Sequence, residues 1–151
     1  MFEIESKSPD EIVITSKGRS IKFNLADETI SADLPVGKIK GPGEFEIENV
    51  AIRGIALGIE KTIYDVSISG VHVGIIGGFE EATKLDELGV ADILCTSSVR
   101  AVREIEPKLV VAMGNVDGMV MDLKLTARTE KKLKVKNKEA LPSTLEVVVL
   151  T

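Results

Sequence analysis

The residues in this chain that could act as nucleophile, base or metal ligand are few. The sequence of 151 residues contains one histidine, His72, and one cysteine, Cys95. A cysteine nucleophile needs a setting that stabilises its thiolate and a base close by. His72 is the only histidine that could act as such a base, and no spacing brings it close to Cys95. We therefore predict a structural role for Cys95 and a surface or packing role for His72.

Serine and glycine motifs complete the inventory of possible sites. Ser97 and Ser98 precede a helical pattern and are expected to be helix caps, since no G-x-S-x-G sequence surrounds them. Gly77-Gly78 ends a strand, but the longer glycine pattern of a phosphate-binding loop is missing. Gly41-Pro42-Gly43 is expected to be a turn that starts a strand, with a place at a ligand rim as the alternative.

The charged clusters do not indicate acid–base catalysis. Asp86, Glu87 and Asp92 are expected to form a solvated helix face and an adjoining loop rather than a catalytic pair. The lysine-rich segment from Lys131 to Lys138 is expected to be a solvated edge, with contact to an anion as the alternative.

Composition excludes several classes of partner. The net charge is −5 and the isoelectric point is about 5.0, whereas nucleic-acid-binding modules are usually basic. Aromatic residues make up 3% of the chain and Trp is absent, so the sequence lacks the stacking surfaces that bind single-stranded nucleic acids or sugars. One cysteine allows no internal disulfide, and neither a signal peptide nor a membrane-spanning apolar run is seen. We expect a cytoplasmic protein that binds neither nucleic acid nor membrane.

A predicted hairpin in the segment from Thr62 to Phe79 organises the rest of the chain. Apolar and polar residues alternate from Thr62 to Ile68, the period of a strand, and Ser69-Gly70 is a typical turn. The apolar face then continues through Val71, Val73 and Ile75. Before this hairpin the pattern predicts only short strands, at Phe2–Ile4, Glu11–Thr15, Ser20–Leu25 and Thr29–Leu34. A further arm alternates from Glu44 to Val50 with a turn at Asn49, and Ala51–Leu57 extends it.

After the hairpin the pattern changes to strands that alternate with helices. Predicted helices cover Glu80–Leu88 and the segment from Ser97 or Ser98 to Ile105. The pattern of Asp117–Arg128 is ambiguous, but Met119, Val120, Leu123 and Ala127 favour a helix there. Predicted strands cover Ala91–Thr96, Lys108–Met113, Leu133–Val135 and Leu145–Leu150, of which Lys108–Met113 is apolar enough to be central. Lys138–Leu141 is expected to be a short helical turn. These elements predict one domain, residues 1–151, with an α/β or α+β sandwich fold.

Several separated segments, taken in order, resemble the metallo-β-lactamase superfamily, in its branch of small zinc-dependent hydrolases related to the ascorbate-phosphate lactonases. They are GPGEFEI from Gly41, LDELGVADIL from Leu85, EPKLVVAMG from Glu106 and LPSTLEVVVL from Leu141. The resemblance covers about residues 38–151. It implies an αββα sandwich of two sheets flanked by helices, here truncated, with zinc as the expected cofactor.

The metal ligands of that family are missing from this chain. The family holds two zinc ions with an H-x-H-x-D-H motif, a further His, a bridging Asp and a final His. Here the segment between Leu25 and Gly41 is too short for the motif, the bridging Asp position falls on Gly78, and the final His position falls on Gly114. The resemblance thus implies no metal ligand and no catalytic residue. A remnant of the site would be bordered by Asn24, Gly41, Pro42, Gly43, Gly77 and Asn115.

Three interpretations follow. The first is a non-catalytic relative, a pseudoenzyme that acts in binding or assembly. Loss of a covering loop and helix would expose apolar sheet surface in such a protein, which predicts a homo-oligomer. The second is a metal-dependent hydrolase of esters or lactones with altered or intersubunit metal ligation. The third is an unrelated fold that imitates the motif order. The small-molecule ligand, if there is one, is not indicated.

Overall fold

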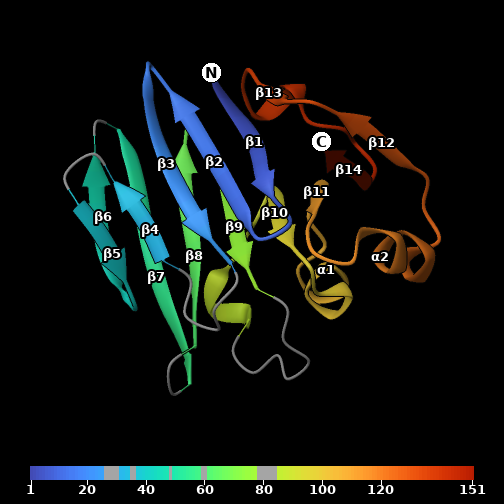
Figure 1. Cartoon of the computed structure of the whole chain (residues 1–151), viewed down its shortest axis with the longest axis horizontal. Coiled ribbons are helices and arrows are strands. Elements are labelled where there is room, and N and C mark those ends of the chain that lie inside the picture. Colours follow the sequence, from blue (N-terminus) through green and yellow to red (C-terminus); the bar gives the residue numbers. More distant parts are fainter. Residues whose placement is uncertain (26–30, 35–36, 48, 59–60, 78–84) are drawn as a thin grey trace.

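The strands of this protein form two sheets that stack face to face. The structure is a computed structural model that describes every residue except 26–30, 35–36, 48, 59–60 and 78–84. The smaller sheet is antiparallel, and Figure 1 shows β1, β2 and β3 in front of the larger sheet. Its order is β13 (Leu133–Val135), β1 (Phe2–Ser8), β2 (Glu11–Ser16), β3 (Arg19–Asn24), β4 (Ser31–Leu34) and β5 (Gly37–Lys40).

The larger sheet is mixed, with an antiparallel half followed by a parallel half. Its order is β12 (Ala127–Glu130), β14 (Glu146–Leu150), β11 (Leu109–Ala112), β10 (Ile93–Thr96), β9 (Val71–Ile76), β8 (Lys61–Ile68), β7 (Val50–Gly58) and β6 (Gly43–Ile47). The strands from β12 to β9 in this order run parallel, and β9 to β6 are antiparallel. The predicted central strand is confirmed, since β11 pairs with β10 on one side and β14 on the other.

The predicted hairpin is β8–β9. Ser69 and Gly70 both have positive φ, 53° and 76°, which is the two-residue turn geometry that matches strand twist. The turn fixes the register that pairs Val66 with Val73 and Tyr64 with Ile75. These residues all point into the space between the two sheets, so the alternation seen in the sequence is confirmed.

The main core lies between the sheets and is made of inward-facing residues from both. The smaller sheet contributes Ile4, Ile14 and Phe23, and the larger sheet contributes Tyr64 and Val111, all almost completely buried. Phe23 and Tyr64 meet with ring centroids 5.8 Å apart and planes tilted by 52°. Burial of this kind contributes about 25 cal/mol per Å² of apolar surface and accounts for the pairing of the two layers.

Helices cover the outer face of the larger sheet. They are η1 (Leu85–Leu88), α1 (Val99–Ile105) and α2 (Val116–Leu123), and a further turn, η2 (Lys138–Ala140), follows β13. Leu88, Val102 and Met119 pack with Ile63, Ile76 and Val110 in a second core. Within the described residues, the layers are therefore the smaller sheet, the larger sheet and the helices that cover the outer face of the larger sheet. The two-sheet α/β fold predicted from the sequence is confirmed.

The helix predictions succeed at the caps and fail at some ends. Ser98 caps α1 by accepting a hydrogen bond from the Ala101 N–H, whereas Ser97 takes no part in that cap. α2 ends at Leu123 because Lys124 has left-handed backbone geometry, so the predicted extension to Arg128 is wrong, and Ala127 and Arg128 belong to β12. For the predicted helix Glu80–Leu88, only its last turn, η1, lies within the described residues.

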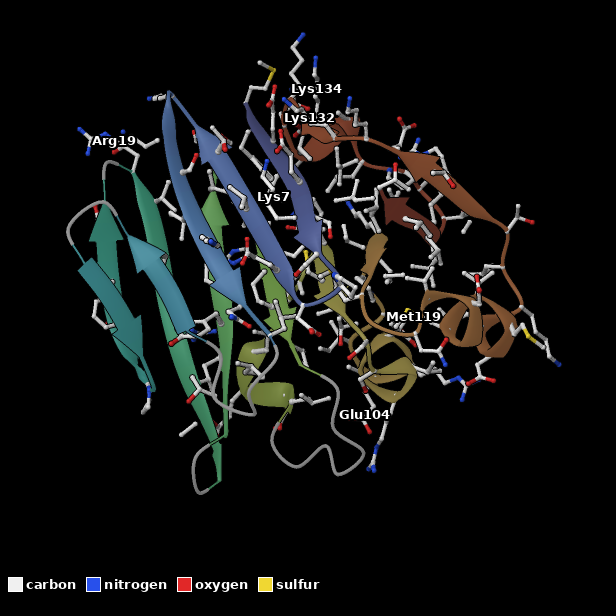
Figure 2. The ribbon with its side chains drawn as sticks, in the orientation of Figure 1. Lys7, Arg19, Glu104, Met119, Lys132 and Lys134 are labelled. Atoms are coloured by element: carbon white, nitrogen blue, oxygen red, sulfur yellow. The ribbon has the colours of Figure 1, made fainter. Side chains whose placement is uncertain are left out.

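The outer face of the smaller sheet is polar and carries ion pairs. Lys132 Nζ lies 3.2 Å from Glu3 Oε2 and 2.9 Å from Glu5 Oε1, and Lys7 Nζ lies 2.9 Å from Glu5 Oε2. Figure 2 shows Lys7, Lys132 and Lys134 over β1 and β13. Among the described residues, Met1, Val90 and Met121 are the large hydrophobic side chains that are exposed, and they do not form a face. No exposed apolar face is therefore seen among the side chains that the structure describes on this sheet.

The two sheets are joined at corners at both ends of the sandwich. Gly41-Pro42 links β5 to β6, and Lys131-Lys132 links β12 to β13. In Figure 1, β5 and β6 form the left end, and β12 and β13 lie in the right half. The sequence did not predict β5. No helix in the described residues has the length and apolar character needed to cross a bilayer.

Candidate functional site

The carboxyl ends of β9, β10 and β11 form the edge at which the sequence places its predicted site. These strands are parallel, so Gly77, Ser97 and Gly114 follow them along one edge of the larger sheet. In open α/β sheets this edge is where ligands bind. Asn115 comes next after Gly114 and caps α2 by accepting a hydrogen bond from the Gly118 N–H at 3.1 Å. Gly78, the predicted position of the bridging Asp, lies outside the described residues.

Backbone of the smaller sheet closes over this edge. The Gly114 N–H donates to the Pro9 carbonyl at 3.2 Å, and the Leu25 N–H donates to the Asp10 carbonyl at 2.7 Å. Pro9 and Asp10 form the turn between β1 and β2. Leu25 directly follows Asn24, and its carbonyl oxygen lies 3.8 Å from the place of a Cβ on Gly77. The structure thus brings Asn24, Gly77, Gly114 and Asn115 to one edge, where the Gly114–Pro9 hydrogen bond joins the two sheets.

Gly114 is itself unsuited to a ligand side chain. Its φ is +64°, which L residues rarely adopt, and a Cβ there would lie 3.2 Å from the Ser97 Cβ. Neighbouring polar atoms are already engaged, since Ser98 N–H donates to Thr96 Oγ1 at 3.0 Å and Met113 N–H donates to the Thr96 carbonyl at 2.9 Å. A shallow hollow of about 250 Å³ lies beside Gly114, lined by Ser6, Lys7, Ala112 and Val116 among others.

Gly41, Pro42 and Gly43 lie elsewhere, at the corner between β5 and β6. Gly43 pairs with Gly54, which pairs with Tyr64, which pairs with Ile75 of β9. This places Gly43 three strands from β9, about 14 Å away in the plane of the sheet. The Gly41 carbonyl accepts a hydrogen bond from the Tyr64 hydroxyl at 3.1 Å. The corner is thereby fixed as a turn, and the structure does not bring it together with Gly77 and Gly114.

His72 is held by a carboxylate on the helix-covered face of the larger sheet. Its Nδ1 lies 3.2 Å from Asp65 Oδ1, and its side chain is 41% exposed. Asp65 Oδ2 also lies 3.4 Å from Arg53 Nη2, which in turn donates to the Glu87 and Leu88 carbonyls at the end of η1. No motif in the sequence indicated this cluster. The hairpin register was the available signal, because it places Asp65 and His72 on one face of adjacent strands.

Asp92 is buried, which corrects the sequence expectation of a solvated loop residue. It is 2% exposed, and its Oδ2 accepts a hydrogen bond from the His72 N–H at 2.9 Å. Its Oδ1 lies 3.7 Å from Lys138 Nζ. Asp86 and Glu87 are exposed on η1 as expected. Asp92 therefore serves the structure of the sheet, and it does not form an acid–base pair with its acidic neighbours.

Cys95 has the properties of a structural cysteine. Its side chain is completely buried between the two sheets, and burial raises the pKa of its thiol to about 12. The thiol therefore stays protonated at neutral pH, and it is not a nucleophile or a metal ligand in this state. His72 points away from it, to the opposite face of the larger sheet. The predicted structural role of Cys95 is consistent with both observations.

The described side chains do not fit a zinc site. Zinc takes histidine nitrogen, cysteine sulfur or carboxylate oxygen, usually with four ligands around the ion. Within the described residues no three His, Cys, Asp or Glu side chains converge closely enough to hold a metal ion. The pair His72 and Asp65 is completed by a guanidinium, Arg53, which repels a cation.

Comparison with known proteins gives a likeness in fold. A scan against protein-family models finds no match, and a search of curated proteins finds none either. Among solved structures the chain is similar to a Thermotoga maritima protein described as a candidate Zn-dependent hydrolase of the metallo-β-lactamase superfamily. The TM-score is 0.71 at 15% sequence identity, over 99% of this chain and 99% of that chain. This protein therefore has a metallo-β-lactamase-like fold.

Proposed function

We propose that this protein is a non-catalytic member of the metallo-β-lactamase-like folds and acts in binding or assembly. The observation that carries the proposal is the hydrogen bond between the Gly114 N–H and the Pro9 carbonyl. It lies at the sheet edge where this fold would position a metal ligand, and it joins main chain to main chain. The backbone strain at Gly114 and the distance of 3.2 Å from a Cβ there to Ser97 both disfavour a ligand side chain.

The remaining candidate ligands are occupied by structural roles. His72 pairs with Asp65, and Asp92 accepts the His72 N–H. Cys95 is buried with its pKa raised to about 12. Activation of a water molecule by zinc requires a metal held by several protein ligands with one open position. The described residues offer no such set, which favours a role in binding over hydrolysis.

Metal content tests the proposal directly. The purified chain would be incubated with excess zinc, desalted and analysed for metal by mass spectrometry. We expect less than about a tenth of an equivalent of zinc per chain. One or two equivalents would contradict the proposal and favour a hydrolase with altered or intersubunit ligation. His72→Ala is the matched control, because zinc that persists in that variant is not held by the only histidine.

A further inference from the structure

Two edge strands at opposite ends of the sandwich carry alternating charges of opposite sign. β6 reads Gly-Glu-Phe-Glu-Ile from Gly43 to Ile47, and the segment around β13 reads Lys-Leu-Lys-Val-Lys from Lys132 to Lys136. β6 is the last strand of the larger sheet, and β13 is the last strand of the smaller sheet. Each strand is paired on one side only, with β7 and β1 respectively. Its other side presents backbone groups that can pair with another strand.

The charges on these edges are available for a partner. Glu44 and Glu46 are exposed, as are Lys134 and Lys136. Within the described residues, none of these four side chains takes part in an ion pair or a side-chain hydrogen bond. Lys132 differs, since it is held by Glu3 and Glu5. The other end strand of the larger sheet, β12, is also different, because its Arg128 is neutralised by Glu130 and Glu146.

A hollow beside β6 adds to the negative end. It has a volume of about 460 Å³ and is lined by Glu44, Glu46, Arg53, Asp65 and Ser67 among others. Three carboxylates and one guanidinium give it an excess of negative charge, and Arg53 is already paired with Asp65. Glu44 lies opposite Arg53 and Glu46 opposite Ala51 in the β6–β7 register, so both glutamates lie on the side of the sheet that faces the helices. A cationic side chain laid along β6 would enter this hollow.

We propose that β13 of one copy of this chain pairs with β6 of a second copy, head to tail. Such a pair would place Lys134 and Lys136 against Glu44 and Glu46, with spacings that match because both pairs are two residues apart on a strand. It would also align Phe45, which packs partly against the core, with Leu133 and Val135, which face the core of their own copy. The charged outer face and the apolar inner face would thus both continue across the interface between the two copies.

The same charges oppose every symmetrical pairing of these two edges. β6 against β6 would set glutamate against glutamate, and β13 against β13 would set lysine against lysine. A joint between unlike edges leaves a free edge at each end, so it extends into a chain of copies unless the rotation closes a ring. Pairing of three to five residues buries little surface, so association would be weak and dependent on concentration and salt.

This inference deepens the assembly part of the proposed function and rests on it, and charge-reversal variants test the surface separately. The wild type, Glu44→Lys/Glu46→Lys and Lys134→Glu/Lys136→Glu would be examined by sedimentation velocity at low ionic strength over a range of concentrations. We expect the wild type to associate and both variants to lose association, with the dissociation constant raised at least about tenfold. An equimolar mixture of the two variants should associate again, because each then offers an edge complementary to the other.

Matched controls exclude a general effect of charge. Asp117→Lys/Asp122→Lys and Lys108→Glu/Lys124→Glu make the same changes in charge on exposed residues away from both edges, and we expect them to associate as the wild type does. Circular dichroism checks that each variant is folded. A monomeric wild type would overturn this inference and self-association with it. Association that persists in both edge variants would refute the assignment of the interface to β6 and β13, but not self-association itself. Neither result affects the interpretation of the zinc measurement above.

Discussion

Asp92 and His72 are hydrogen-bonded to each other in both directions. The His72 N–H donates to Asp92 Oδ2 at 2.9 Å, and the Asp92 N–H donates to the His72 carbonyl at 2.8 Å. The Asp92 carbonyl also accepts from the Lys108 and Leu109 N–H groups, at 3.0 Å and 3.2 Å. One residue therefore ties together the starts of β9, β10 and β11, the parallel strands whose far ends form the candidate site.

Removal of the Asp92 carboxylate should destabilise the fold. We expect Asp92→Ala to lower the free energy of unfolding by about 1–3 kcal/mol, because the part-buried His72 N–H loses its acceptor. Asp92→Asn keeps an acceptor oxygen and should lose less. Urea unfolding at neutral pH measures both, and Asp86→Ala, on an exposed side chain, is the control. Equal stability of Asp92→Ala and the control would refute the structural role.

Reintroduction of a histidine at the predicted ligand position should fail to create a metal site. Gly114→His should cost about 1–2 kcal/mol for left-handed backbone alone, with more for the contact to Ser97. Gly18→His is matched, since Gly18 has φ +76° with open space around it and should show the backbone cost only. Thermal unfolding with and without zinc is the measurement. A zinc-dependent rise in melting temperature in Gly114→His would show that a usable site remains.

The ion pairs on the outer face of the smaller sheet should make the free energy of unfolding depend on pH in the acidic range. Lys132 and Lys7 lower the pKa of Glu5 from 4.5 to about 2. Because the folded state has the lower pKa, the contribution is complete above about pH 4.5 and is lost as the pH falls towards 2. Glu5→Gln should lose less stability over that range than the wild type. Denaturant titrations at pH 6, 4 and 2.5 would compare them, and parallel pH profiles would exclude this origin.

Tight packing around Gly54 should make the β5–β6 corner sensitive to a single methyl group. A Cβ on Gly54 would lie 2.7 Å from the Gly41 carbonyl oxygen and 3.0 Å from a ring carbon of Tyr64. Gly54→Ala should therefore lower the free energy of unfolding by about 1–3 kcal/mol or more, as overpacking does. Tyr64→Phe, which removes only the hydroxyl bound to Gly41, should cost less than that. A stable Gly54→Ala variant would show that the corner yields easily.

The buried thiol should react only when the protein opens. With its pKa raised to about 12, Cys95 carries almost no thiolate at pH 8 and is also shielded from reagents. We expect labelling by a thiol-specific disulfide reagent to be slow in the native protein and fast in denaturant. The two rates are measured by absorbance on the same sample. Rapid labelling of the folded chain would instead reveal an accessible, activated cysteine.

The fold was predictable where local pattern and burial agree. The β8–β9 hairpin followed from period-two alternation and a Ser-Gly turn, and α1 followed from its Ser98 cap. Asp92 was mistaken for a solvated residue because its burial depends on the packing of β9, β10 and β11. These three strands are distant in sequence and adjacent only in the folded sheet. β5 carries only Gly-Lys-Ile-Lys, too little pattern to identify a strand.

The candidate site was predictable only in outline. Resemblance placed Gly77, Gly114 and Asn115 near one another, and the parallel strands explain why they share an edge. The hydrogen bond that joins Gly114 of that edge to Pro9 could not be predicted, because main-chain hydrogen bonds leave no trace in residue type. The Arg53–Asp65–His72 cluster required the exact strand register before its members could be placed together.

The pairing of β1 with β13 has a consequence for how the molecule forms. Phe2 lies opposite Val135 and Ile4 opposite Leu133, so the first strand of the chain finds one of its two neighbours only after some 130 residues. Contacts this distant in sequence are slow to form, because the entropic cost of closing the loop comes before the stabilising contacts are made. During synthesis the edge of β1 therefore stays unpaired until β13, which lies in the last fifth of the chain, has emerged.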